Sequence, residues 1–114
     1  ELRYPPPAPA PTGVRVIAVD MPGQPQAQLR LRMSAPARGS ADEAAFDVTN
    51  FVYGGAFLSR LNSNVREEKG LTYGAHSSYR AMRDDGFFEV GFQVAGKNAG
   101  IALTEIEAEL AGMT

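Results

Sequence analysis

Residues 72–95 read TYGAHSSYRAMRDDGFFEVGFQVA, and they hold two candidate strands around a polar turn. In the second candidate strand, every other residue from Phe88 to Val94 is apolar. This period of two is typical of a strand with one buried face. The sequence Met-Arg-Asp-Asp-Gly at 82–86 supplies turn-forming residues before it. This stretch therefore predicts an antiparallel pair of strands, 72–80 and 87–95.

Two further strands are expected on the N-terminal side of this pair. Residues 14–20 read VRVIAVD, and residues 27–34 read AQLRLRMS, in which leucines and Met33 alternate with polar side chains. Residues 21–26 are of turn-forming types, so the segments 14–20 and 27–34 are expected to pair as strands. The loop between them is too long for a two-residue hairpin.

Three helices complete the pattern. Ser40 stands three residues before Glu43, a capping-box arrangement that predicts a helix start, and the expected buried face comprises Ala44, Val48, Phe51 and Val52. A second helix is expected at 57–69, ending at Gly70 and packing through Leu58, Leu61 and Val65. A third is expected from about Asn98, with its inward face formed by Ala99, Leu103, Ile106 and Leu110.

The predicted order is strand, strand, helix, helix, strand, strand, helix (ββααββα). This order favours an α+β domain, an antiparallel sheet with helices packed on one face. The opening stretch contains five of the eight prolines, so residues 1–12 are expected to be a proline-rich linker and residues 13–114 the domain. Because the chain stops where the last helix ends, the domain is expected to be partial.

Composition narrows the classes of function. A length of 114 residues, 44% hydrophobic residues and 21% charged residues are typical of one globular domain. The net charge of −2 supplies no basic stripe, which argues against nucleic acid as a partner. The chain has no cysteine, so thiolate metal sites and cysteine nucleophiles are excluded.

The residues of hydrolytic sites are also missing. His76 is the only histidine, and no HxxEH sequence occurs, so no zinc is expected to bind to this chain. His76 itself is interpreted as a strand histidine with a local hydrogen bond. The serines lack a G-x-S-x-G elbow, and Gly54-Gly55 is not followed by the Gly-Lys-Ser/Thr of a phosphate loop.

Arg66 and Tyr73 are the remaining candidates for binding. Arg66 falls in the last turn of its predicted helix, Gly70 turns the chain, and Tyr73 opens the next strand, so the two side chains could converge on one spot. Guanidinium donors and a phenolic hydroxyl together suit a carbonyl or carboxylate oxygen.

The sequence around these two residues resembles that of a known protein family. Residues 53–79 read YGGAFLSRLNSNVREEKGLTYGAHSSY. This stretch resembles the C-terminal half of the pitrilysin/insulinase family of zinc metallopeptidases, through Gly54-Gly55, Ser59-Arg60-Leu61, Val65-Arg66-Glu67 and Gly70-Leu71-Thr72-Tyr73. With the flanking elements, the resemblance covers roughly residues 13–112.

The resemblance implies a two-half clamshell enzyme that hydrolyses peptides. One half carries zinc in an HxxEH motif, and the other half binds no metal but supplies an arginine and a tyrosine to the chamber. This chain matches the metal-free half, so the resemblance implies that Arg66 and Tyr73 bind the substrate backbone near the scissile bond. No catalytic residue is expected in this chain. The zinc-binding half would lie in the same full-length chain or in a partner subunit.

A rival interpretation comes from another class, a structural or assembly subunit with the same fold and no peptidase role. The presence of both Arg66 and Tyr73 favours the peptidase, because scaffolding does not require them. The isolated chain is expected to be inactive and to self-associate. The residues leave the compartment open, and only the family resemblance suggests a periplasmic or exported protein.

Overall fold

The computed structural model describes residue 9 and residues 12–113. In chain order the elements are β1 (Gln26–Ala35), α1 (Glu43–Asn50), a π-helical turn (Phe51–Gly55), α2 (Arg60–Asn62), a second π-helical turn (Ser63–Glu68), β2 (Ala75–Ala81), β3 (Gly86–Ala95), a 3₁₀ turn (Gly96–Asn98) and α3 (Ala99–Ala111). Within the described residues, no helix is long and apolar enough to cross a membrane.

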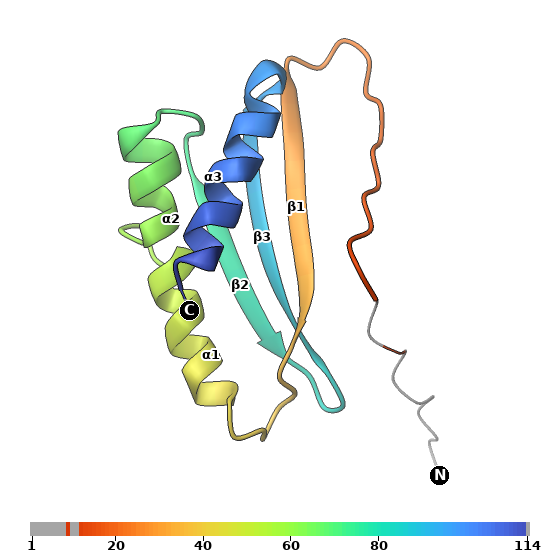
Figure 1. Ribbon diagram of the computed structural model, residues 1–114, viewed down its shortest axis with the longest axis vertical. Helices are drawn as coiled ribbons and strands as arrows, with labels where there is room; N and C mark the ends of the chain where they lie inside the picture. Colours follow the sequence, from red (N-terminus) through yellow and green to blue (C-terminus); the bar gives the residue numbers. More distant parts are fainter. Residues whose placement is uncertain (1–8, 10–11, 114) are drawn as a thin grey trace.

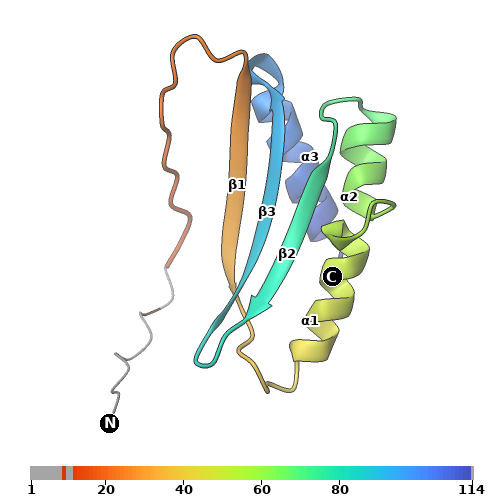
Figure 2. The ribbon, with the colours of Figure 1, turned by 180° about the vertical axis from the view of Figure 1, so that it is seen from behind.

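The three strands form one antiparallel sheet in the order β1-β3-β2, with β3 at its centre. The three α-helices of the described residues lie against one face of this sheet, as Figure 1 shows, and Figure 2 shows the opposite face, which none of them covers. The predicted α+β class, with helices on one face of an antiparallel sheet, is confirmed.

The core lies between this sheet and its helices. The alternation predicted for β3 is confirmed, because Phe88, Val90, Phe92 and Val94 are all buried on the helix side. From α3, Ile106 is fully buried, and Ala99 and Leu110 pack against the core, so the predicted inward face of this helix is confirmed at these three residues. Leu103 is only partly buried, and Ala102, which was not predicted, is fully buried. The opposite face of β3 carries Glu89, Gly91 and Gln93.

The face that the sequence predicted for the first helix was wrong. Ala44, Val48, Phe51 and Val52 are exposed, and the sheet is instead contacted by Phe46, Tyr53 and Gly54. The Phe46 ring lies 5.3 Å from the Tyr79 ring, and Gly54 sits directly against Ser77 of β2. Only glycine, which has no Cβ atom, allows this close approach. The contact between Gly54 and Ser77 sets the rotation of the helix about its axis.

The predicted helix starts were also shifted. α1 begins at Glu43, and Ser40 makes no cap; the Glu43 carboxylate instead accepts a hydrogen bond from the N–H of Gly39 at 2.6 Å. The second helix begins at Arg60, where the Ser59 hydroxyl accepts from the N–H of Asn62 at 3.4 Å. Leu58 therefore precedes the helix and is 84% exposed, whereas Leu61 and Val65 are buried as predicted.

The strand predicted at 14–20 was wrong. This segment pairs with none of the described strands, and Val14, Val16, Ile17 and Val19 are exposed. A turn at Met21–Gln24, with Gly23 at φ +82°, precedes β1, and β3 is the only described neighbour of β1. β-branched residues favour a strand only where a neighbour and a packed face complete it, and this segment has neither. The predicted linker, 1–12, lies almost wholly outside the described residues.

Candidate functional site

The junction between α2 and β2 carries Arg66 and Tyr73. The helix ends in the π-helical turn Ser63–Glu68, and the N–H of Leu71 donates to the carbonyl of Val65 at 2.8 Å. Gly70 has φ +60°, a left-handed conformation that glycine adopts without strain, so the predicted helix-terminating glycine is confirmed.

Two side chains fix the loop that follows. The buried Oδ1 of Asn62 accepts a hydrogen bond from the N–H of Ala75 at 2.9 Å, which joins α2 to the first residue of β2. The Thr72 hydroxyl has one proton, and the shorter of its two acceptor distances, 2.6 Å, leads to the carbonyl of Gln93. The same oxygen accepts from the N–H of Gly74 at 3.2 Å, so the strand predicted from Thr72 begins only at Ala75.

Arg66 is half-buried and held by two neighbours. Its guanidinium carbon lies 4.1 Å from the centre of the Phe57 ring, a cation–π contact. Its Nη1 lies 3.1 Å from the Glu67 carboxylate, but it is not aligned for a hydrogen bond with any described group. The contact with Glu67 is therefore ionic only, and the guanidinium keeps unused donor capacity.

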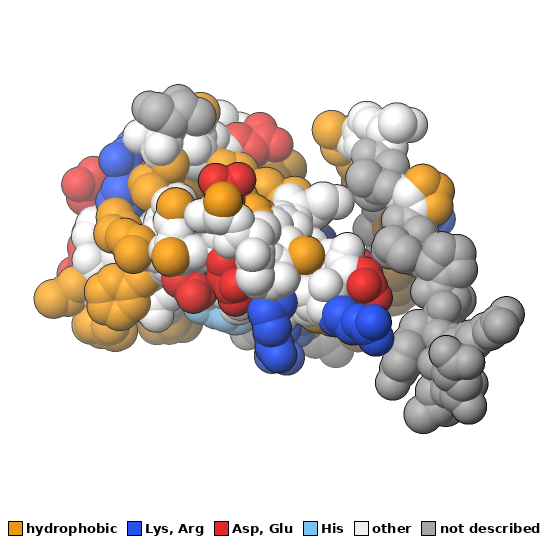
Figure 3. Space-filling model, turned by 90° about the horizontal axis from the view of Figure 1, so that it is seen from below, with side chains coloured by type: hydrophobic (Ala, Val, Ile, Leu, Met, Phe, Trp, Pro, Cys, Tyr) orange, Lys and Arg blue, Asp and Glu red, His pale blue; other side chains and the backbone are white. Residues whose placement is uncertain are grey.

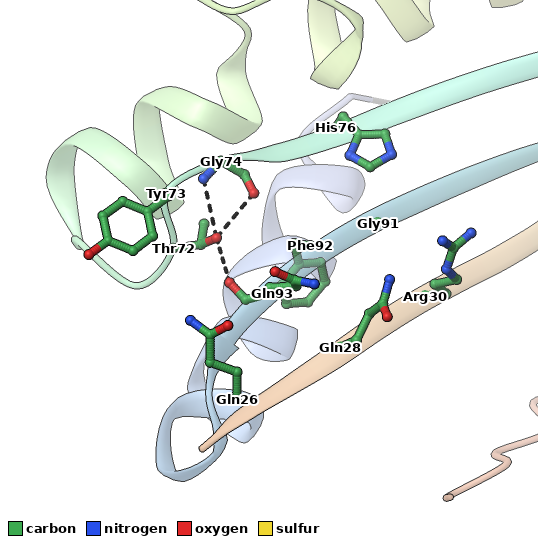
Figure 4. Close-up of a pocket in the computed structure, with 10 residues that line it drawn as sticks. All are labelled: Gln26, Gln28, Arg30, Thr72, Tyr73, Gly74, His76, Gly91, Phe92 and Gln93. Atoms are coloured by element: carbon green, nitrogen blue, oxygen red, sulfur yellow. Dashed lines mark hydrogen bonds between the residues drawn. The ribbon is translucent and has the colours of Figure 1, made fainter. Parts of the chain in front are cut away.

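Tyr73 has the opposite environment. Its side chain is 95% exposed, and no described residue makes a hydrogen bond to its hydroxyl. The ring stands out from the loop, away from the strands (Figure 4). No hydrogen bond or ring contact joins Arg66 to Tyr73 in the described part of the chain, so their convergence on a substrate stays a prediction.

A hollow of about 270 Å³ opens beside Tyr73, on the face of the sheet opposite the helices. It is lined by Gln26, Gln28, Arg30, Thr72, Tyr73, Gly74, His76, Gly91, Phe92 and Gln93 (Figure 4). It was not predicted from the sequence, although the alternating polar residues of β1 and the glycine at the middle of β3 are signals that the sequence contains. Arg66 does not line it.

The structure also corrects the interpretation of His76. Its ring has no hydrogen-bond partner in the described residues, so the expected local hydrogen bond was wrong. Nor does any group of three or more His, Asp or Glu side chains in these residues have the arrangement of a metal site.

A family profile described as "Peptidase M16 inactive domain" matches residues 1–114. A crystal structure of a peptidase M16 inactive domain from Pseudomonas fluorescens is 33% identical, with a TM-score of 0.73, over 76% of this chain and 21% of that one. A conserved protein from Enterococcus faecalis V583 is 35% identical, with a TM-score of 0.69, over 75% of this chain and 20% of that one. This chain thus spans about a fifth of the length of those structures. No curated protein matches it significantly.

Proposed function

Since the chain belongs to the peptidase M16 family, as an inactive domain, we propose that it is the substrate-binding, non-catalytic domain of a zinc-dependent metallopeptidase. The whole enzyme hydrolyses peptides or proteins in a chamber between two halves. Zinc and the base that activates water belong to the other half, which is part of the same full-length chain or of a partner subunit. Zinc supplies the Lewis acid and the activated water for hydrolysis.

In this proposal Arg66 and Tyr73 hold the substrate backbone near the scissile bond. The observation that carries the proposal is the state of Tyr73, an exposed aromatic residue with an unpaired hydroxyl on a loop whose ends are fixed by Asn62 and Thr72. The exposed ring packs against no described residue, and its unpaired hydroxyl, on a loop whose backbone is fixed, is suited to donate to an incoming carbonyl oxygen. Arg66 brings a positive charge whose orientation is set by Phe57.

The test uses the complete enzyme with its zinc half. We expect Arg66→Ala and Tyr73→Phe each to reduce peptide turnover, on the order of 10²-fold, because each removes a donor to the oxygen that becomes negative as the carbonyl turns tetrahedral. The double variant should lose less than the product of the two single losses, since the two groups act together.

The control for this test is stability. Tyr73 is exposed and Arg66 is only half-buried, so both variants should melt within a few degrees of the wild type. Wild-type turnover in both single variants would remove the substrate-binding role of Arg66 and Tyr73. A complete wild-type protein that turns over no peptide would instead favour the assembly subunit without a peptidase function.

A further inference from the structure

Within the hollow beside Tyr73, the missing side chain of Gly91 leaves a gap. The antiparallel register pairs Gly91 of β3 with Arg30 of β1 on one side and with His76 of β2 on the other. A Cβ atom at Gly91 would lie only 3.0 Å from Cε1 and 3.2 Å from Nε2 of His76. The imidazole thus leans over the space that any other residue at 91 would fill.

Three carboxamides line the hollow on one side of this gap. Gln28 pairs with Gln93 in the next row of the sheet, and Gln26 lies at the start of β1. Figure 4 shows Gln26, Gln28 and Arg30 rising from β1, with the His76 ring lying between β2 and β3. No described residue makes a hydrogen bond to the side chain of Gln26, Gln28, Gln93 or His76. Their donors and acceptors are therefore available to a ligand.

The hollow is richer in donors than in acceptors. Arg30 has donors only, and one of its nitrogens contacts Glu89 at 3.0 Å, while its side chain is 63% exposed. The carboxamides and the imidazole add N–H groups, and no Asp or Glu side chain lines the hollow. A carboxylate is the peptide group that such an arrangement binds best, through charge-assisted hydrogen bonds.

We propose that this hollow is a specificity subsite for an acidic side chain of the peptide substrate. The inference rests on the proposed function, because Tyr73 at the rim is the residue assigned to the substrate backbone. Gly91 lies two residues along β3 from Gln93, whose carbonyl holds Thr72, so the gap is about 7 Å from the loop that carries Tyr73. The acidic residue therefore lies at least two residues from the position held by the Tyr73 hydroxyl, since an extended peptide advances at the same rate as a strand and the Tyr73 ring extends from the loop away from the strands (Figure 4).

The experiment measures kcat/KM of the complete enzyme on internally quenched peptides. A single glutamate is moved through each position on both sides of the cleaved bond, and a matched series carries lysine in its place. At one position the wild type should prefer glutamate on the order of tenfold, as expected from one charge-assisted hydrogen bond.

Three variants test whether the hollow causes that preference. Gly91→Val fills the gap with a residue that suits a strand, while His76→Ala and Gln28→Ala remove exposed polar groups without disturbing the core. We expect the preference for glutamate to fall close to unity in all three. Ser34→Ala is the matched control, since Ser34 lies on the same face of β1, opposite Phe87 and outside the hollow, and it should keep the full preference.

A second measurement separates this inference from the proposed function. With zinc removed by a chelator, fluorescence anisotropy of labelled glutamate and lysine peptides reports binding alone. Selective binding that Gly91→Val abolishes supports the subsite even if Arg66→Ala and Tyr73→Phe turn over like the wild type. Equal affinity for both peptides, or a glutamate preference that survives in His76→Ala and Gln28→Ala, overturns the subsite whatever the result for Arg66 and Tyr73.

Discussion

The phenol of Tyr53 is fully buried, and its hydroxyl donates a hydrogen bond to the carbonyl of Ile106 at 3.1 Å. Burial, and to a smaller extent the charge of Glu109, raises the pKa of Tyr53 to about 12. In the unfolded chain a tyrosine keeps a pKa of about 10. The folded state therefore favours the neutral phenol, and the stability that this provides is complete below pH 10 and is lost as the pH rises toward 12.

We expect the free energy of unfolding to fall between pH 10 and pH 12, and to fall less in Tyr53→Phe, which has no phenol to ionise. At neutral pH the same variant should lose about 1 kcal/mol with the hydrogen bond to Ile106. Urea denaturation at several pH values measures both effects. Tyr73→Phe, which removes an exposed hydroxyl outside the core, is the control. If the free energy of unfolding depended on pH equally in the wild type and in Tyr53→Phe, the raised pKa of Tyr53 would be contradicted.

At the scale of elements, the contact between Gly54 and β2 positions the first helix on the sheet. A Cβ atom at Gly54 would lie 2.7 Å from the Ser77 hydroxyl and 2.9 Å from the Ser77 backbone nitrogen. That nitrogen belongs to a paired strand, and the hydroxyl is hydrogen-bonded to Oδ1 of Asn50 at 2.8 Å. Both atoms are therefore held in place by these contacts.

Gly54→Ala should therefore destabilise the fold by roughly 1–3 kcal/mol, the usual cost of overpacking. Gly100→Ala makes the matched control, since a Cβ atom there meets nothing within 4 Å and Gly100 lies in α3. That variant should instead stabilise the helix by roughly 0.5–1 kcal/mol. Urea midpoints measured side by side would contradict the packing argument if the two substitutions had similar effects.

The elements differed in how far the sequence could predict them. β3 was predicted to within one residue, because a single alternating stripe leaves one choice of buried face. The first helix offered two apolar stripes, one through Val48 and Phe51 and one through Phe46 and Tyr53. The choice between them depends on the contact of Gly54 with Ser77, which a local pattern does not contain.

The same distinction holds for the candidate site. The resemblance of the sequence to a known family indicated Arg66 and Tyr73 as candidates. The position of Arg66 is set by Phe57, which precedes the helix and was expected inside it. The hollow was missed because its residues come from three strands and a loop. Only the register that pairs Arg30, Gly91 and His76 brings them together.

At the scale of the whole molecule, apolar surface remains uncovered in the described residues. Val48, Phe51 and Val52 are exposed on α1 and the turn after it, and Phe57 and Leu58 are exposed in the next loop. Seen from below, hydrophobic side chains gather on the side of α1 and α2 (Figure 3). Contiguous apolar surface of this kind is typical of a contact with another protein surface.

We therefore expect the isolated chain to self-associate, most simply as a symmetric dimer that buries this helix surface in both copies. Its weight-average mass in sedimentation equilibrium should rise with concentration. Val48→Lys combined with Phe51→Lys should return it toward the monomer, because both side chains are exposed and the introduced charges resist burial. Gln24→Lys adds charge at an exposed polar position and should leave the association unchanged. A chain that stays monomeric at every concentration, or a double variant that associates like the wild type, would show that this surface does not drive assembly.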